Sequence, residues 1–237
     1  MSKQLLGILI ISSALVACQQ TRLAETELEA VQKASDVYLA YEQGDCARVY
    51  MLTGEEALGG LSKGELRDSL TLARAFCFEQ EGETESALAI YAQLVRGDSR
   101  TFGATDAGER RREISALASD TEYATWVEKT VADAGAMTAA RTPLSRIPAQ
   151  FPPAARAAGI EGYAVVVFGV SESGETETPL VVASEPPLLF DGASLRAVRQ
   201  WQFEPQEDAM AKSRQVIRIL FRNASGITIE DAERLSE

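Results

Sequence analysis

The clearest pattern of hydrophobic positions in the chain is a run of β-branched, aromatic and small residues from Tyr163 to Val170. The polar segment 171–174 follows it and ends in a glycine, and the chain then becomes apolar again at residues 180–182. A short polar segment with a terminal glycine between two such runs predicts a β-hairpin. Alternate residues of the first run are apolar on both faces, which is typical of a central strand.

A helix and a further strand follow this hairpin. After Asp191, which can cap a helix, Leu195, Val198 and Trp201 recur at helical spacing. From Val216 to Phe221, large apolar residues recur at every second position, as in a strand with one face on a core. Two strands, a helix and a strand predict an α+β layer: a three-stranded antiparallel sheet covered by a helix.

The first half of the chain has helical periodicity instead. Apolar residues recur every three or four positions within residues 25–137, and glycines such as Gly44 and Gly82 interrupt the pattern. This predicts an N-terminal all-α domain of helical hairpins at 25–137, in which residues 101–108 form a loop. The proline-containing segment 138–146 is then the predicted linker to the second domain.

One of these hairpins resembles half of a tetratricopeptide repeat (TPR). A small residue, an aromatic residue, a glycine, an alanine and another aromatic residue stand at the offsets of the repeat. These positions are Ala75, Phe78, Gly82, Ala87 and Tyr91. Thr71 and Arg74 occupy positions that are usually large and apolar, and Ser99 replaces the closing proline. A generic helical hairpin is therefore the alternative to a TPR-like one.

Two cysteines lie in the predicted helical domain, Cys46 and Cys77. In an exported chain such a pair predicts a disulfide, which would close a loop of about 30 residues and stabilise the domain by roughly 3 to 4 kcal/mol. The alternatives are two reduced cysteines in the core or a metal-binding pair. Metal binding is disfavoured because two thiols without histidine are an incomplete ligand set.

Residues 109–113, Glu-Arg-Arg-Arg-Glu, are the densest run of charge in the chain. Glutamates and arginines three or four positions apart on one helix attract each other, and such runs are usually solvated. We therefore expect this segment to be an exposed helix face with local ion pairs.

The N-terminal residues resemble a bacterial lipoprotein signal. Lys3 precedes an apolar stretch that is too short to span a bilayer permanently, and Leu-Val-Ala-Cys ends it at Cys18. The resemblance implies a signal peptide at 1–17, lipidation of Cys18 and a tether at 18–24. It also implies anchoring at the periplasmic face of the envelope, and Gln19 favours the outer membrane. A plain secretory signal and an uncleaved anchor are the alternatives.

The composition of the chain disfavours several classes of function. The chain has 35 acidic and 23 basic residues and a net charge of −12, which disfavours nucleic acid as a partner. It has no histidine, the usual general base and a common metal ligand. No nucleophile with an accompanying base is evident either. We therefore expect that the protein is not an enzyme and has no cofactor and no metal.

The second half of the chain resembles the C-terminal domain of TonB proteins. The family has an aromatic-proline pair, an alanine-rich helix, a glycine-led strand and a Trp-x-Phe-x-Pro motif. The corresponding positions are Phe151, Pro152, Ala154 to Ala158, Gly159, Gly162, Ala164, Val166, Phe168, Val170, Gly174, Phe190, Asp191, Leu195, Ala197, Val198, Trp201, Phe203 and Pro205. The resemblance implies a TonB C-terminal-like domain at 147–223, followed by a tail at 224–237.

The resemblance also implies a function. TonB proteins pair their last strand with an extended peptide of an outer-membrane transporter, so that backbone hydrogen bonds supply affinity. Transferred here, the partner-binding edge strand is Gln215, Val216, Ile217, Arg218, Ile219, Leu220 and Phe221, with Val216, Arg218 and Leu220 facing away from the helix. The alternative is that these side chains make only a solvated sheet face and that the tail from Asn223 to Glu237 covers the edge.

This chain departs from energy-transducing TonB proteins in its N-terminal half. Those proteins have an uncleaved membrane helix and a long spacer rich in proline, where this chain has a lipoprotein-like signal and a helical domain. The sequence predicts a role in TonB-dependent transport across the outer membrane. A structural or scaffolding envelope lipoprotein without energy transduction is the alternative.

Overall fold

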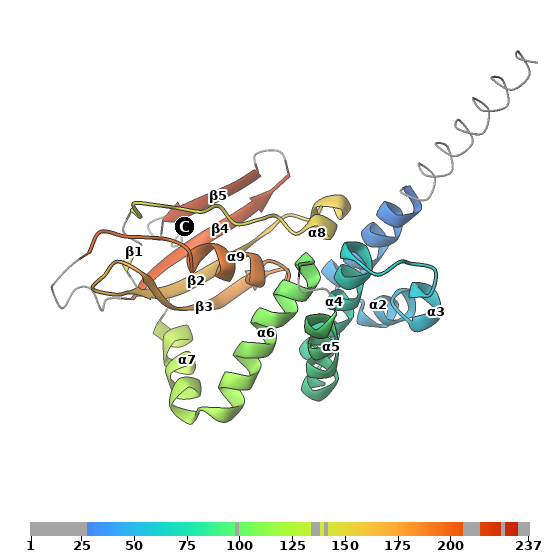
Figure 1. The fold of residues 1–237 in the computed structure, drawn as a ribbon, viewed down its shortest axis with the longest axis horizontal. Coiled ribbons are helices and arrows are strands. Elements are labelled where there is room, and N and C mark those ends of the chain that lie inside the picture. The colour runs from blue at the N-terminus through green and yellow to red at the C-terminus, as the bar shows by residue number, and fades with distance from the viewer. Residues whose placement is uncertain are drawn as a thin grey trace, which may run out of the picture.

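The structure is a computed structural model that describes residues 28–97, 100–133, 138–139, 142–205, 214–223 and 226–231. The helices are residues 28–42, α2 (Cys46–Leu52), α3 (Glu55–Leu58), α4 (Glu65–Gln80), α5 (Thr84–Arg96), α6 (Phe102–Ser119), α7 (Thr121–Asp133), α8 (Pro153–Ala158) and α9 (Asp191–Val198). The strands are β1 (Thr138–Ala139), β2 (Gly162–Val170), β3 (Thr176–Glu185), β4 (Gln215–Arg222) and β5 (Gly226–Asp231). Helices dominate the first half and the sheet the second, which confirms the predicted α+β class (Figure 1).

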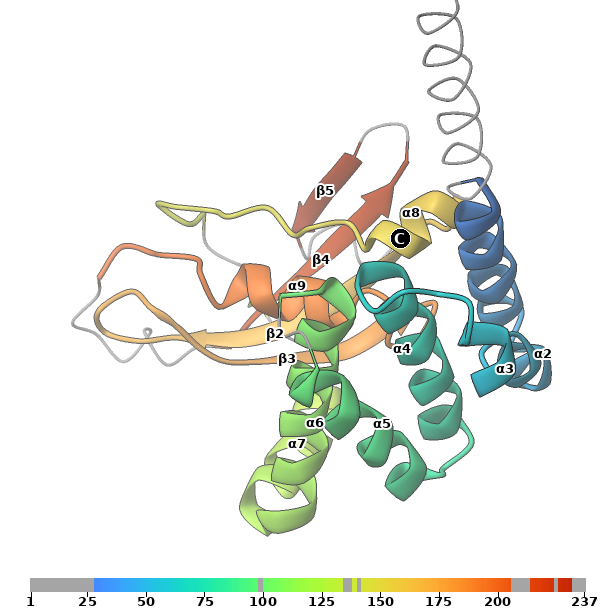
Figure 2. The ribbon, with the colours of Figure 1, turned by 45° about the vertical axis from the view of Figure 1, so that its right-hand side comes forward.

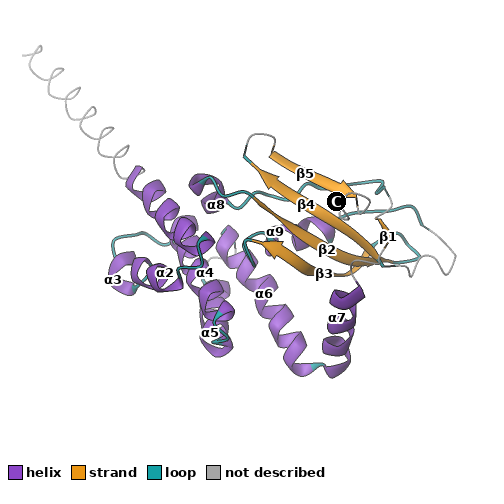
Figure 3. Ribbon diagram, turned by 180° about the vertical axis from the view of Figure 1, so that it is seen from behind, coloured by secondary structure: helices purple, strands orange, loops and turns teal. Residues whose placement is uncertain are grey.

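The sheet has the order β1-β4-β2-β3, and β5 also pairs with β4. As predicted, β2 is a central strand: it is antiparallel to β3 on one side and to β4 on the other. The hairpin turn depends on Gly174, whose φ of +87° suits glycine, and an added Cβ would lie 2.1 Å from the Phe203 carbonyl oxygen. Figure 3 shows the sheet from the face opposite α9.

The aromatic core between α9 and the sheet is centred on Trp201, which is completely buried. Its ring meets Phe168 edge-on at 6.2 Å between centroids, and Phe203 lies 6.5 Å away. The indole Nε1 donates a hydrogen bond of 2.9 Å to the Ile147 carbonyl, so the polar atom of this buried ring is satisfied. Trp201 thus joins β2 to the segment that precedes α8.

The helical region begins as its sequence pattern predicts. Gly44, at a φ of +71°, ends helix 28–42, and Asp45 caps α2 by accepting a 3.0 Å hydrogen bond from the Arg48 amide. The structure joins Cys46 to Cys77 by a disulfide, so α2 is fastened to α4 with 5.4 Å between the Cα atoms. The relation of the α4–α5 hairpin to a TPR stays a prediction.

One local prediction is wrong: residues 102–108 are not a loop but the first two turns of α6. The Thr101 hydroxyl caps this helix by accepting from the Ala104 amide at 3.1 Å. The turn also packs closely, because a Cβ on Gly103 would lie 2.7 Å from the Asp68 backbone. Small residues allow this approach but leave little hydrophobic periodicity in the sequence, so the helix was not evident there.

The helical region and the sheet share one continuous cluster of buried apolar side chains. Helix α6 lies against α9, and α9 covers the sheet, in front of which it is drawn in Figures 1 and 2. The predicted linker also contributes to the sheet, because β1 pairs in parallel with the start of β4 and Ser145 bridges to Gln202. The division of the chain into domains at 138–146 stays a prediction.

The buried position of Trp201 generates a stability prediction. Replacing Trp201 by alanine should lower the free energy of unfolding by about 3 to 5 kcal/mol, because it empties the centre of the aromatic core. Urea denaturation followed by circular dichroism measures this. Trp126 on α7 is only half-buried, so Trp126→Ala is the matched control and should lower stability less. Equal losses for the two variants would contradict the central role of Trp201.

Candidate partner-binding site

The residues predicted to bind a partner, Gln215 to Phe221, form β4 in the structure. Ile217, Ile219 and Phe221 are completely buried in the core that α9 covers. Phe221 stacks on Phe190, the residue before α9, with 4.3 Å between ring centroids. The face of β4 that carries these three side chains is therefore part of the core, as the alternating pattern predicts.

The opposite face of β4 differs from both interpretations of the sequence. Val216 and Leu220 are also buried, with 2% and 7% of their surface exposed. Val216 lies opposite Val167 of β2, another buried residue. The Arg218 guanidinium lies over the Tyr163 ring at 4.0 Å. This face is therefore neither a solvated surface nor a set of open side-chain pockets.

The prediction that β4 has an exposed edge is wrong in this structure. β5 pairs with β4 in antiparallel register from Ile217, opposite Asp231, to Arg222, opposite Gly226. β1 pairs with the two remaining residues, Gln215 and Val216. The physical reason is that an uncovered edge leaves a row of unpaired backbone groups, and the tail contains extended residues that satisfy them. This is the arrangement in which the tail covers the edge.

The comparison with protein families identifies the unit to which β4 belongs. Residues 148–222 match the family model described as Gram-negative bacterial TonB protein C-terminal. They are a TonB C-terminal domain. The match begins after β1 and ends before β5, so the TonB C-terminal domain includes β4 but neither strand that covers its edge.

Two curated relatives are similar to a part of the chain. The protein TonB of Pseudomonas aeruginosa is 36% identical over 64 residues, which are 27% of this chain and 19% of that protein. The protein TonB of Salmonella typhimurium is 33% identical over 79 residues, 33% of this chain and 31% of that protein. The chain thus spans less than a third of the length of either relative.

One solved structure is similar as well. It is described as the TonB2 protein from Vibrio anguillarum, with 25% sequence identity and a TM-score of 0.31. The match covers 36% of this chain and 83% of the other.

A second feature of the TonB C-terminal domain was missed by sequence reasoning: its helix α9 is docked on α6 through ion pairs. Arg196 pairs with Asp106 of α6, and Arg199, just after α9, pairs with Glu109. Asp106 and Glu109 are 3% and 7% exposed. The two acids are three residues apart, and so are the two arginines. This matching spacing is visible in the sequence, but it predicts ion pairs only once α6 and α9 are known to be neighbours.

The charged run 109–113 is accordingly not the exposed helix face that the sequence predicts. Glu109 is buried and Arg110 is largely covered. Arg110 pairs with Glu79 of α4 and with Glu113 on its own helix. The run therefore contains local ion pairs, as expected, but it also connects α6 to α4 and to the TonB C-terminal domain.

Buried carboxyl groups at this contact are hard to ionise. Burial raises the pKa of Asp106 to about 6, although the charge of Arg196 and its hydrogen bond oppose the rise. Burial also raises the pKa of Asp191, the first residue of α9, to about 7. A hydrogen bond from Ser184 and the charge of Arg110 oppose that rise, while Glu113 and Glu79 add to it.

The other features that the sequence analysis considered are the lipid anchor, a membrane helix and a metal site. Cys18 and the signal at 1–17 lie outside the described residues, so lipidation stays a prediction. Among the described residues, no helix has the length and apolar character needed to span a membrane. Those residues also contain no group of three or more acidic or sulfur ligands arranged to hold a metal ion.

The raised pKa of Asp191 predicts how stability depends on pH. The folded-state pKa of about 7 lies above the usual 3.8, so the folded protein binds this proton more tightly than the unfolded chain. The stabilisation of the folded protein that results from this tighter proton binding is fully present below about pH 4 and is lost as the pH rises through 7. Lowering the pH from 8 to 5 should therefore stabilise the protein through Asp191 by about 2 kcal/mol.

The Asp191→Asn variant tests this, because an amide keeps the shape of the side chain but does not titrate. The difference in unfolding free energy between pH 5 and pH 8, measured by urea titration, should be smaller in the variant by about 2 kcal/mol. If the variant showed the same difference between pH 5 and pH 8 as the wild-type protein, the assignment of this pH dependence to Asp191 would be contradicted.

Proposed function

We propose that this protein is a lipid-anchored periplasmic protein that binds an extended peptide of an outer-membrane partner along β4, with β5 displaced. The TonB C-terminal domain at 148–222 supports a TonB-related role in envelope transport. In this proposal the partner is a TonB-dependent transporter and the role is binding and not catalysis. One observation carries the proposal: both strands on the β4 edge come from outside the TonB C-terminal domain.

The energetics of strand exchange fit a reversible interaction. An incoming peptide would replace the backbone hydrogen bonds of β5 with equivalent ones, each of which contributes only about 0.5 to 1.5 kcal/mol net. The core that holds β4 on its other edge, through β2 and α9, would not change. The tail therefore acts as an intramolecular competitor whose effective concentration is in the millimolar range for a short connection.

Removal of the competitor gives a direct test. A chain that ends at Asn223, and so lacks β5, should bind a labelled N-terminal transporter peptide at least about tenfold more tightly than the full chain, which corresponds to about 1.4 kcal/mol. Fluorescence anisotropy gives the dissociation constants. The matched control ends at Asp231, retains β5 and should bind like the full chain.

Two outcomes would contradict the proposal. One is equal affinity of the full chain and of both truncated chains, since β5 would then not compete for β4. The other is failure of the shorter chain to bind any transporter peptide, provided that its unfolding transition shows that it is folded.

The anchor is tested separately. Metabolic labelling with palmitate should mark the wild-type protein, and Cys18→Ser should lose the label because the thiol that accepts the lipid is absent. Globomycin, which blocks the lipoprotein signal peptidase, should make the unprocessed form accumulate. Labelling that persists in Cys18→Ser would overturn the lipid anchor but would leave the β4 proposal intact.

A scaffolding role without energy transduction is the second candidate. The observation that favours it is the docking of α6 on α9, because it fixes a helical region to the TonB C-terminal domain and makes one body with two separate faces. This candidate predicts that the full chain and both truncated chains bind no transporter peptide.

A further inference from the structure

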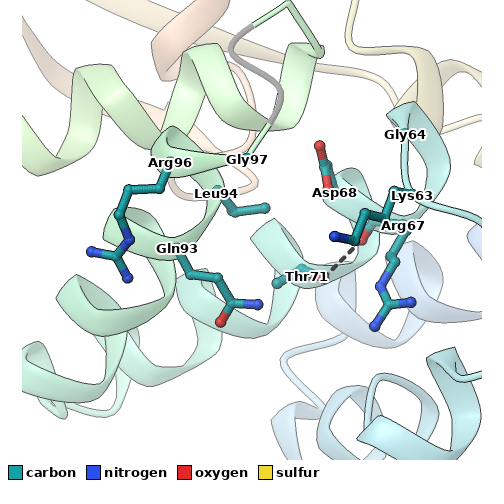
Figure 4. Close-up of a pocket in the computed structure, with 9 residues that line it drawn as sticks. All are labelled: Lys63, Gly64, Arg67, Asp68, Thr71, Gln93, Leu94, Arg96 and Gly97. Carbon is teal, nitrogen blue, oxygen red and sulfur yellow. Dashed lines mark hydrogen bonds between the residues drawn. The ribbon is translucent and has the colours of Figure 1, made fainter.

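A cavity of about 670 Å³ lies between the start of α4 and the end of α5. Figure 4 shows Lys63 and Arg67 on one wall and Gln93 and Arg96 on the other, with Asp68 between them. The apolar Leu94 also lines the cavity. Three cationic side chains, two from the start of α4 and the loop before it and one from the end of α5, therefore line one space in a protein whose net charge is −12.

These cations differ from four of the arginines around α6 and α9. Arg110, Arg112, Arg196 and Arg199 each pair with a carboxylate. Within the described part of the chain, no carboxylate forms an ion pair with Lys63, Arg67 or Arg96. In a chain with 35 acidic residues, a cavity whose cations lack carboxylate partners has charge available for a ligand.

The other polar groups of the cavity have defined roles. Arg67 donates one hydrogen bond of 3.2 Å to the Leu61 carbonyl, which steadies its guanidinium and leaves further N–H groups. Thr71 donates its hydroxyl hydrogen to the Arg67 carbonyl at 2.8 Å, so its oxygen remains an acceptor. Asp68 accepts a 2.8 Å hydrogen bond from Thr101 and brings a negative charge to the cavity wall.

The cavity contains cations, one carboxylate and an apolar side chain, and these groups favour some anionic ligands over others. A compact polyanion such as phosphate would meet the three cations but would also be repelled by Asp68. An acidic peptide offers spaced carboxylates, which suit guanidinium groups. It also offers backbone N–H groups for Asp68 and Gln93 and aliphatic carbon for Leu94. We propose that the α4–α5 cavity binds an acidic segment of a partner protein.

The test uses the full chain and a labelled octapeptide of alternating glutamate and alanine. The double variant Lys63→Gln/Arg96→Gln removes two exposed charges that make no hydrogen bond or ion pair within the described residues. It should weaken binding roughly 2- to 30-fold, the loss expected for two surface ion pairs. Arg48→Gln/Arg111→Gln is the control: it removes two equally exposed arginines elsewhere on the molecule and should leave binding unchanged.

Added salt should weaken the wild-type interaction, and a glutamine–alanine peptide should not bind. Equal affinity of the two double variants would overturn the site, and so would failure of the acidic peptide to bind the wild-type protein. Competition by inorganic pyrophosphate at equal concentration would overturn the peptide assignment in favour of a phosphate ligand. The chain that ends at Asn223 should bind this peptide like the full chain, which separates this inference from the proposal for β4.

Discussion

The contact between α6 and α9 is the interaction on which the arrangement of the whole molecule depends. Asp106 is almost completely buried, and its partner Arg196 is itself largely covered. Removing one member of such a pair is strongly destabilising, because the other is then a buried charge without a partner. The contact is also close: a Cβ on Gly192 would lie 2.4 Å from Oδ1 of Asp106. Nothing larger than glycine fits at this point without displacing the carboxylate.

This contact makes α9 a shared element. One side of the helix covers the sheet, and another side meets α6, so seven of its eight residues are buried. The Tyr41 hydroxyl adds a second tie by donating to the Pro187 carbonyl at 2.6 Å, just before α9. The helical region lies at the β3 side of the sheet, whereas β5 lies at the opposite edge (Figure 1). A partner at β4 would therefore approach from the edge opposite β3, which α7 and α9 contact.

The parts of the fold that could be predicted from sequence are those in which a local pattern coincides with a buried face. The β2–β3 hairpin, the helix end at Gly44 and the apolar helix face that leads to Trp201 all follow from spacing and residue type within a few positions. Helix 102–108 could not be predicted in this way, because its tight packing uses Gly103 and Ala104 and so leaves no hydrophobic stripe. Its partner surface on α4 is more than thirty residues away in the chain.

The candidate site was predicted only in part, for a related reason. Alternation from Ile217 to Phe221 shows that a strand exists, but it does not show what pairs with its edge, because backbone hydrogen bonds carry no signature in the side chains. The segment that covers the edge, Gly226–Asp231, has β-branched residues at three of six positions, and its other three residues, a glycine and two acids, are depleted in strands. Within the described residues, β5 pairs with one strand only, β4, through its backbone ladder. In the proposed exchange, an incoming peptide would therefore replace β5 without disturbing the core beneath β4.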